Sequence, residues 1–277
     1  MLRNTRDLLT YTVSATDGII GHVQNFYFDD EAWVIRYLVV DTGTWLSRRR
    51  VLISPIAIGH PNREEEVLPV SMTKEQVKNS PDIDTDKPVS RQHEMQYLGY
   101  YGYPHYWGGS GLWGSSSNPN LLMPGYTGFA PETEVAEADA TAAYTRFEAL
   151  HQQNDDPHLR DYEAVLKYRL ETSDGDLGHI EGLLIEDETW AIRYIIANTS
   201  TWWVGHQVLI APQWIKEVSW YDATIAVNLT RQAVKDAPPY DPAVSLDREH
   251  EISIYDHYAQ AGYWAAEEQR RSHSADR

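Results

Sequence analysis

Two histidines at matching places in the sequence are the sharpest candidates for chemistry. His22 and His179 lie 157 residues apart, and each ends a Gly-His pair shortly after an Asp-Gly dipeptide. An imidazole titrates near neutral pH, so either side chain could transfer protons or bind a metal ion. No second ligand follows at a spacing typical of a metal site. We interpret both as strand histidines hydrogen-bonded to a neighbouring loop, with a metal-binding or proton-transfer role as the alternative.

A denser polar group occurs twice, with the spacing Arg-x-His-Glu. Such a group could bind an anion or polarise a water molecule. The alternative is an ion-paired extension that pins its segment to its own domain. The two copies consist of Arg91, His93 and Glu94, and of Arg248, His250 and Glu251.

Tyrosines and tryptophans follow each polar group closely. Such side chains can lay their rings on a surface while the hydroxyl or indole N–H reaches a polar partner. We therefore predict docking segments rather than ligand cages. The rings assigned to the candidate interaction surface are Tyr101, Trp107, Tyr258 and Trp264.

One basic cluster, Arg48-Arg49-Arg50, completes the candidate interaction surface. The second copy has Gly205-His206-Gln207 at these positions, so the cluster belongs to one copy alone. The three arginines could bind an anionic partner or pair with the acidic turns at 29–31 and 187–188. A solvated loop is the alternative interpretation.

The composition excludes several classes of function. Among 277 residues, 41 are acidic and 23 are Lys or Arg, and the net charge of −18 opposes binding to nucleic acid and insertion into anionic membranes. The absence of cysteine excludes disulfides, thiolate catalysis and Cys-ligated metals. No Gly-rich phosphate loop or serine nucleophile motif occurs. We therefore expect no enzyme, and no catalytic, cofactor-binding or metal-binding residues.

The histidine and the Arg-x-His-Glu group each occur twice because a large part of the chain is repeated. A shift of 157 positions aligns residues 2–107 with 159–264 without a gap, and 34 of 106 pairs are identical. A gapless register of this length predicts one fold formed twice. We expect the two copies to pack about a pseudo-twofold axis within the chain. The expected organisation is a first repeat at 1–107, a flexible acidic linker at 108–157, a second repeat at 158–264 and a disordered tail at 265–277.

Each repeat reads as mainly β. The Asp-Gly dipeptide at 17–18 predicts a tight turn between strands, and the acidic stretch at 29–31 predicts an exposed hairpin tip. A short helix follows at 71–81, where Thr73 and Gln76 have the spacing of a capping box. These features predict two small antiparallel β-barrels in tandem, each with a short helix and an aromatic C-terminal extension. The strands expected in the first repeat are 11–15, 22–28, 33–40, 50–55 and 67–70.

The repeated unit resembles the PRC-barrel domain family. The resemblance is carried by Asp17, Gly18 and Gly21, by the hairpin through Trp33 and Tyr37, and by the strand Val-Leu-Ile-Ser-Pro. This domain is similar to the cytoplasmic barrel of the photosynthetic reaction centre H subunit and to the C-terminal domain of the ribosome maturation factor. The resemblance specifies a fold more closely than a function.

The resemblance implies a non-enzymatic interaction or assembly module in a bacterial cytosol, with a stress-related role and protein partners of unknown identity. Two alternatives stay open. One is a regulatory module that binds an anion or a metal ion. The other is a soluble relative of a photosynthetic or electron-transfer subunit. The sequence start has no apolar core of signal-peptide length, and no apolar run approaches the length of a membrane span, so we expect a cytoplasmic protein.

Overall fold

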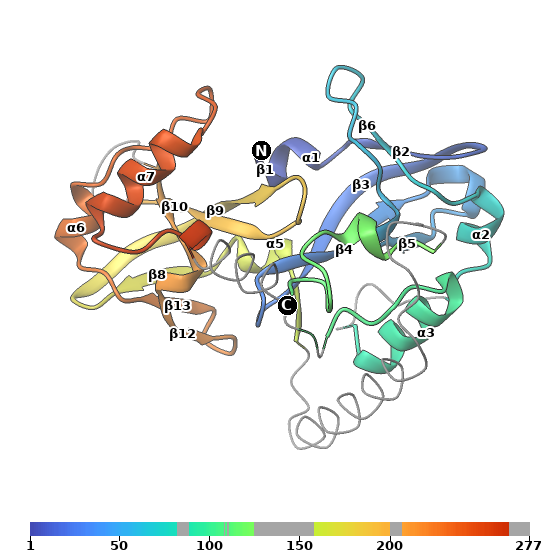
Figure 1. The fold of residues 1–277 in the computed structure, drawn as a ribbon. Coiled ribbons are helices and arrows are strands. Elements are labelled where there is room, and N and C mark those ends of the chain that lie inside the picture. Colours follow the sequence, from blue (N-terminus) through green and yellow to red (C-terminus); the bar gives the residue numbers. More distant parts are fainter. Residues whose placement is uncertain (82–88, 108, 110, 125–157, 200–206, 266–277) are drawn as a thin grey trace, which may run out of the picture. The chain divides into compact units, whose positions relative to one another are not determined.

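The computed structural model describes residues 1–81, 89–107, 109, 111–124, 158–199 and 207–265 (Figure 1). The chain forms two compact units. Unit 1 comprises Met1–Asn4, Val165–Leu184 and Arg193–Arg277, and unit 2 comprises Thr5–Ala164 and Ile185–Ile192. Both units are mainly β, as the repeated pattern predicts. Each unit also contains a short segment from the other repeat.

Unit 2 is built around a six-stranded sheet in the order β5-β4-β3-β2-β6, with β7 paired to β3 beyond the end of β2. The 12-residue β3 is long enough to pair with β2 at one end and with β7 at the other. The strands are β2 (Thr12–Ala15), β3 (Gly18–Asp29), β4 (Val34–Asp41), β5 (Arg50–Ile53), β6 (Val67–Pro69) and β7 (Leu159–Asp161).

Short helices connect and flank this sheet. The longest of those in the described residues is α3, which carries the polar group of the first repeat and is capped at its start by Ser90. The described helices of unit 2 include α1 (Thr5–Leu8), α2 (Lys74–Lys78) and α3 (Arg91–Tyr101), and the described 3-10 turns are η1 (Gly43–Leu46), η2 (Pro55–Ala57) and η3 (Pro119–Leu122).

Unit 1 repeats the plan in a seven-stranded sheet of order β11-β10-β9-β8-β13-β12, with β1 paired to β9. Helix α5 (Tyr162–Val165) spans the change from unit 2 to unit 1. The other elements are β1 (Leu2–Asn4), β8 (Arg169–Thr172), β9 (Gly175–Glu186), β10 (Ile192–Asn198), β11 (Gln207–Ile210), η4 (Pro212–Trp214), β12 (Ile215–Ser219), β13 (Thr224–Val227), α6 (Arg231–Lys235) and α7 (Arg248–His257).

The sheets are mixed, which corrects the prediction of purely antiparallel barrels. Strand β2 pairs with β6 in parallel, and β8 pairs with β13 in parallel. A parallel pair needs a long crossover between its strands. In each repeat the intervening strands supply that crossover. The last strand, β6 or β13, therefore returns to lie beside β2 or β8.

The Asp-Gly turn has a second role that the tight-turn signal does not reveal. Asp17 Oδ1 accepts a hydrogen bond from the backbone N–H of Lys74 at 2.8 Å, at the start of α2. Asp174 does the same for Arg231 at 2.7 Å, at the start of α6. The predicted capping box is confirmed, because the Gln76 N–H donates to Thr73 Oγ1 and the Thr73 N–H donates to Gln76 Oε1.

Gly21 and Gly178 allow two strands to approach closely. A Cβ atom at Gly21 would lie 1.9 Å from the backbone oxygen of Asp41, and one at Gly178 would lie 2.1 Å from that of Asn198. No side chain fits at such a distance, so glycine is required where the long strand bends against its partner.

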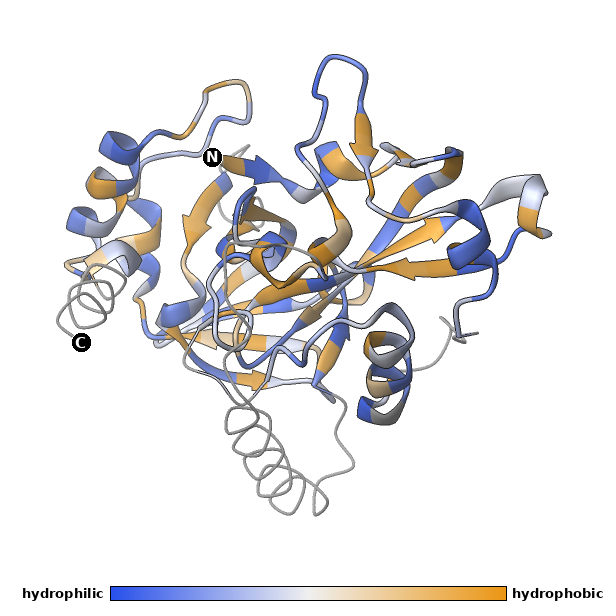
Figure 2. Ribbon diagram, turned by 45° about the vertical axis from the view of Figure 1, so that its right-hand side comes forward, coloured by the Kyte–Doolittle hydropathy of each residue, from blue (hydrophilic) through white to orange (hydrophobic). Residues whose placement is uncertain are grey.

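Aliphatic and aromatic side chains fill the interior of each unit. Seven consecutive residues of β4, Val34–Val40, are buried, and Figure 2 shows extended hydrophobic stretches along the strands. Burial on both faces of a strand produces such a run, which is apolar except for Arg36. None of the described helices is long and apolar enough to cross a membrane.

Part of the predicted linker is folded onto unit 2. Trp113 is 1% exposed, and residues 111–116 form two isolated β-bridges ahead of η3. The Gly- and Ser-rich composition predicted flexibility here, but a buried indole anchors the segment. Residues 125–157 of the predicted linker and most of the predicted tail lie outside the described residues.

Candidate functional site

The polar group of the first repeat lies at the start of α3 in unit 2. Ser90 Oγ accepts the backbone N–H of His93 at 3.4 Å and caps the helix. From this first turn, Glu94 points into the unit and is 0% exposed, whereas the His93 side chain is exposed. The Arg-x-His-Glu spacing therefore places glutamate and histidine in different environments.

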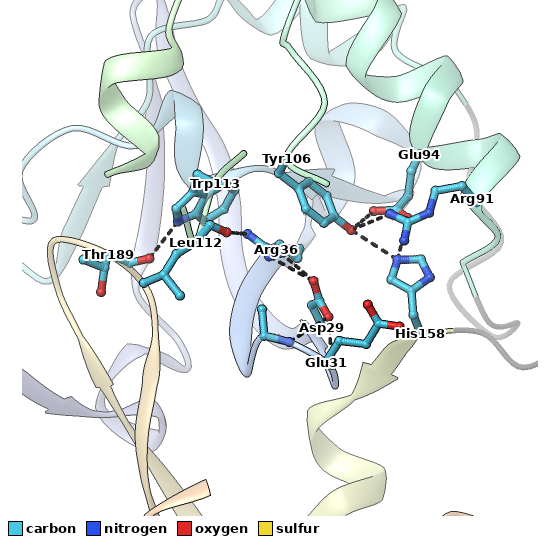
Figure 3. Close-up of polar contacts among 11 residues, drawn as sticks. Asp29, Glu31, Arg36, Arg91, Glu94, Tyr106, Leu112, Trp113, His158 and Thr189 are labelled. Carbon is cyan, nitrogen blue, oxygen red and sulfur yellow. Dashed lines mark hydrogen bonds and ion pairs between the residues drawn. The ribbon is translucent and has the colours of Figure 1, made fainter. Parts of the chain in front are cut away.

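Glu94 is surrounded by three donors (Figure 3). The Tyr106 hydroxyl donates a short hydrogen bond to Glu94 Oε1. Glu94 Oε2 lies 2.8 Å from His158 Nε2 and 3.1 Å from Arg91 Nη1. The Tyr106 hydroxyl also lies 3.2 Å from His158 Nε2. A buried carboxylate with this many partners is stabilised as a structural acceptor, because each lost bond would leave a polar atom unpaired.

A second buried ion pair lies beside this cluster. Arg36 is 2% exposed, and its Nη2 lies 2.9 Å from Asp29 Oδ2. Asp29 Oδ1 accepts the N–H of Glu31 at 2.9 Å and thereby shapes the hairpin tip. Burial alone would raise the pKa of the Asp29 carboxyl, but the charge and hydrogen bonds of Arg36 outweigh it and hold that pKa below its ordinary value of 3.8.

Aromatic rings enclose the Arg36 guanidinium. Its central carbon lies 3.9 Å from the centre of the Tyr106 ring and 4.6 Å from that of Trp113. Arg36 Nη1 donates to the carbonyl of Leu112 at 2.7 Å, and Trp113 Nε1 donates to the carbonyl of Thr189 at 2.8 Å. Cation–π contacts and hydrogen bonds thus fix the extension after α3 onto its own sheet (Figure 3).

Burial also suppresses ionisation of the tyrosines nearby. It raises the pKa of the Tyr106 hydroxyl well above 10, and the charge of Glu94 adds to this effect. Burial has the same effect on Tyr37, whose ring packs edge-on against Tyr97 at 5.2 Å. Both hydroxyls therefore stay protonated at neutral pH, and neither is suited to proton transfer.

Unit 1 contains the matching glutamate cluster. Glu251 Oε1 accepts the hydroxyls of Tyr194 and Tyr263, each at 2.9 Å, and Glu251 Oε2 lies 3.1 Å from Arg248 Nη1. The Arg193 guanidinium lies 4.0 Å from the centre of the Tyr263 ring, as Arg36 does over Tyr106. The two units therefore pin their extensions by the same device.

The Glu251 cluster predicts a pH-dependent stability. Burial raises the pKa of the Glu251 carboxyl above its ordinary value of 4.5, against the hydrogen bonds of Tyr263 and Tyr194 and the charge of Arg248. A raised carboxyl pKa stabilises the folded state below pH 4.5, and this contribution is lost as the pH rises through the folded value. Glu251→Gln should remove that dependence. As the pH rises above 4.5, the free energy of unfolding of the wild type should therefore fall relative to that of the variant.

Chemical denaturation of both proteins at a series of pH values between 4 and 7 measures this difference. Glu249→Gln is the matched control, because Glu249 is exposed on the same helix. A difference between wild type and Glu251→Gln that stays constant over this pH range would contradict the prediction.

The other residues of the candidate interaction surface occupy different surroundings. His250 Nδ1 lies 2.6 Å from the capping Asp247, and its side chain is 57% exposed. The rings of Trp107 and Trp264 stack on the guanidinium groups of Arg91 and Arg248, at 4.1 and 4.4 Å. Tyr101 stacks with Tyr103, and Tyr258 packs against Trp214. The structure therefore distributes the sequence-selected surface between two units, and many of its rings face their own unit.

The arginine cluster is divided in the same way. Arg49 donates to the carbonyls of Lys78, Ser80 and Pro81 at 2.9, 2.7 and 3.1 Å, and so closes the C-terminal end of α2. Arg48 and Arg50 are exposed, and Arg50 lies opposite Asp41 in the β4–β5 pairing. The outer two arginines are therefore more exposed than Arg49, which is partly buried.

His22 and His179 are exposed on β3 and β9. His22 Nδ1 lies 3.3 Å from the carbonyl of Thr10 and 3.4 Å from the hydroxyl of Thr12. This arrangement matches a strand histidine bonded to a neighbouring segment. Among the described residues, no three His, Asp or Glu side chains gather where they could hold a metal ion.

Sequence reasoning did not select five residues of the buried cluster as site residues, namely Arg36, Tyr106, His158, Trp113 and Asp29. Arg36 and Tyr106 are identical in both repeats, and this identity was a usable signal. No repeat signal exists for His158, whose counterpart is Met1, or for Trp113 and Asp29. The roles of His158 and Trp113 depend on contacts between segments far apart in the chain. Asp29 was expected at an exposed hairpin tip, but it is 6% exposed because it pairs with Arg36 of the same hairpin.

The fold and these clusters define a β-rich chain in which paired polar groups fasten aromatic extensions to sheets. Residues 3–76 match the PRC-barrel domain family, a range that runs from β1 into α2. The chain therefore carries a PRC-barrel domain in its first repeat, and the resemblance read from the sequence is confirmed there. A comparison with curated proteins finds no match.

Proposed function

We propose that this chain is a non-enzymatic PRC-barrel protein that acts as an interaction or assembly module for other proteins. The observation that carries the proposal is the saturation of the two buried glutamates. Glu94 and Glu251 each bind tyrosine and arginine side chains of the same unit. Carboxylates held in this way support a role in shaping a surface rather than in transferring protons to a substrate.

The loop around Arg48 and Arg50 is the surface we assign to the partner. Both side chains are exposed on a chain whose net charge is −18. Nearby, the Lys74 ammonium lies 4.4 Å from the centre of the Trp45 ring. A local group of cations beside an aromatic ring favours an acidic protein surface, since complementary charge accelerates association and selects partners.

The double variant Arg48→Gln/Arg50→Gln tests this assignment. Arg49 is left in place because its guanidinium closes α2. Each protein is coupled to a resin, exposed to extract from cells that produce the chain naturally, and the captured proteins are quantified by mass spectrometry. We expect an acidic protein that the wild type captures to be lost from the variant, and the loss to weaken when salt screens the charges.

Lys167→Gln/Lys216→Gln is the matched control, because it removes two exposed positive charges from unit 1. It should capture the same partner as the wild type. Equal losses in both double variants would indicate a general charge effect and would contradict the assigned surface. Failure of the wild type to capture any partner would contradict the interaction module itself.

A further inference from the structure

The N-terminal strands of the two repeats are exchanged between the units. Strand β7 (Leu159–Asp161) corresponds to β1 (Leu2–Asn4) after the shift of 157 residues, and β9 corresponds to β3 in the same way. Yet β7 of the second repeat pairs with β3, and β1 of the first repeat pairs with β9. The assignment of Met1–Asn4 to unit 1 and of residues 159–161 to unit 2 reflects this exchange.

Strand β7 is integrated into unit 2 through its backbone. It pairs with β3 in antiparallel register, with Tyr27, Phe28 and Asp29 opposite Asp161, Arg160 and Leu159. The N–H of Asp30 also donates to the carbonyl of His158 at 3.1 Å. Without β7, this part of β3 would present an open sheet edge, which is a template for another strand.

Side chains of the same segment strengthen its attachment. Arg160 Nε lies 2.5 Å from Asp30 Oδ2, and Asn25 Nδ2 donates to Asp161 Oδ2 at 2.8 Å. The ring of Tyr162 meets that of Phe26 edge-on at 5.5 Å. Leu159 is 2% exposed. Residues 158–162 are therefore recognised by backbone pairing, charge and apolar burial together, which are the components of strand addition.

His158 extends this attachment to the buried glutamate of the first repeat. Its Nε2 atom lies 2.8 Å from Glu94 Oε2, although this histidine is the first residue of the second repeat. The polar cluster of unit 2 is thus completed by the exchanged segment. The first repeat alone would lack both the strand and this hydrogen-bonding partner.

We propose that each repeat is an acceptor for the N-terminal strand of another copy, so that this chain is a covalently linked, strand-exchanged pair. The partner that fits the open edge of β3 is the Leu-Arg-Asp segment that begins the second repeat. The partner that fits β9 is the Leu-Arg-Asn segment that begins the first. The two repeats then hold together without the segment that joins them in sequence. This proposal does not depend on the proposed function.

Paired cysteines test the exchange directly, because the natural chain has none. The hydrogen bond from Asp30 to His158 places Tyr27 and Asp161 at a non-hydrogen-bonded pair of the ladder, where Cα atoms lie about 4.5 Å apart, within the range for a disulfide. The first variant is Tyr27→Cys/Asp161→Cys. The matched control is Tyr27→Cys/Asn4→Cys, because Asn4 would lie opposite Tyr27 if the first repeat kept its own strand.

Both variants also receive a protease site within residues 125–157. After mild oxidation and cleavage, non-reducing electrophoresis shows whether the two fragments stay joined. We expect Tyr27→Cys/Asp161→Cys to keep them joined. In Tyr27→Cys/Asn4→Cys both cysteines lie in the N-terminal fragment, so we expect that fragment to be released with two free thiols that still react with a maleimide. A disulfide in the control variant, or in neither variant, would overturn the exchange.

A second measurement avoids substitution in the core, where Tyr27 is 3% exposed. The chain that carries only the protease site is cleaved and passed through a gel-filtration column without denaturant. We expect both fragments to elute together in equal amounts as one particle, and to separate only in denaturant. Two separate, folded fragments would overturn the proposal.

Discussion

Replacing Trp113 with alanine should lower the free energy of unfolding of unit 2 by about 3–5 kcal/mol, the usual range for a buried aromatic residue. The indole is 1% exposed, donates to the carbonyl of Thr189 and packs beside the Arg36 guanidinium. The variant loses apolar burial and leaves the carbonyl of Thr189 without this donor. Denaturation by urea, followed by circular dichroism, measures the change.

Tyr221→Ala is the control for this prediction, because Tyr221 is 97% exposed at the turn between β12 and β13. It should change the free energy of unfolding by less than about 0.5 kcal/mol. If Trp113→Ala were as stable as Tyr221→Ala, the segment after α3 would have no anchoring role.

Asp29→Asn should cost about 3–5 kcal/mol, because it leaves the buried Arg36 without its counter-charge. The loss should depend on pH. The pKa of Asp29 is held below 3.8, so its contribution is fully present above that value and is lost as the pH falls through the lower folded pKa. Wild type and variant should therefore converge in acid, which denaturant titrations at neutral pH and below pH 3.8 can measure.

The pair between Arg63 and Asp187 provides the comparison within the same unit. Its N–O distance is 2.8 Å, but the Arg63 side chain is 50% exposed. Solvent screening limits such a pair to about 0–1 kcal/mol, so Asp187→Asn should have a small effect at all pH values. Equal losses for Asp187→Asn and Asp29→Asn would show that burial of the Arg36 pair adds nothing.

Local patterns predicted the features that depend on neighbouring residues. The Asp-Gly turn, the long hairpin and the capping box of Thr73 and Gln76 all follow from spacings of a few residues. The repeat alignment added the equivalence of the two units' strands. These features can be predicted from the sequence because turns and helix caps are formed by residues only a few positions apart.

The buried cluster could be predicted only in part. Glu94 and Arg91 stood out because the repeat preserves them, but the histidine beside Glu94 is His158 rather than the adjacent His93. Trp113 lies in a stretch whose composition resembles a linker. The strand exchange cannot be predicted from the sequence either. An N-terminal strand would present the same residues to the sheet edge of its own repeat as to that of the other repeat.

The bond from Asp17 to the first amide of α2 has a consequence for how relatives of this chain are compared. One acidic residue both forms a turn and starts a helix 57 positions later, and Asp174 does the same for α6. Few substitutions can satisfy both demands, so an aligned set of homologues should show these carboxylates as nearly invariant. A search for reactive residues that relied on invariance would then select Asp17 and Asp174, although both side chains serve to hold a turn against a helix.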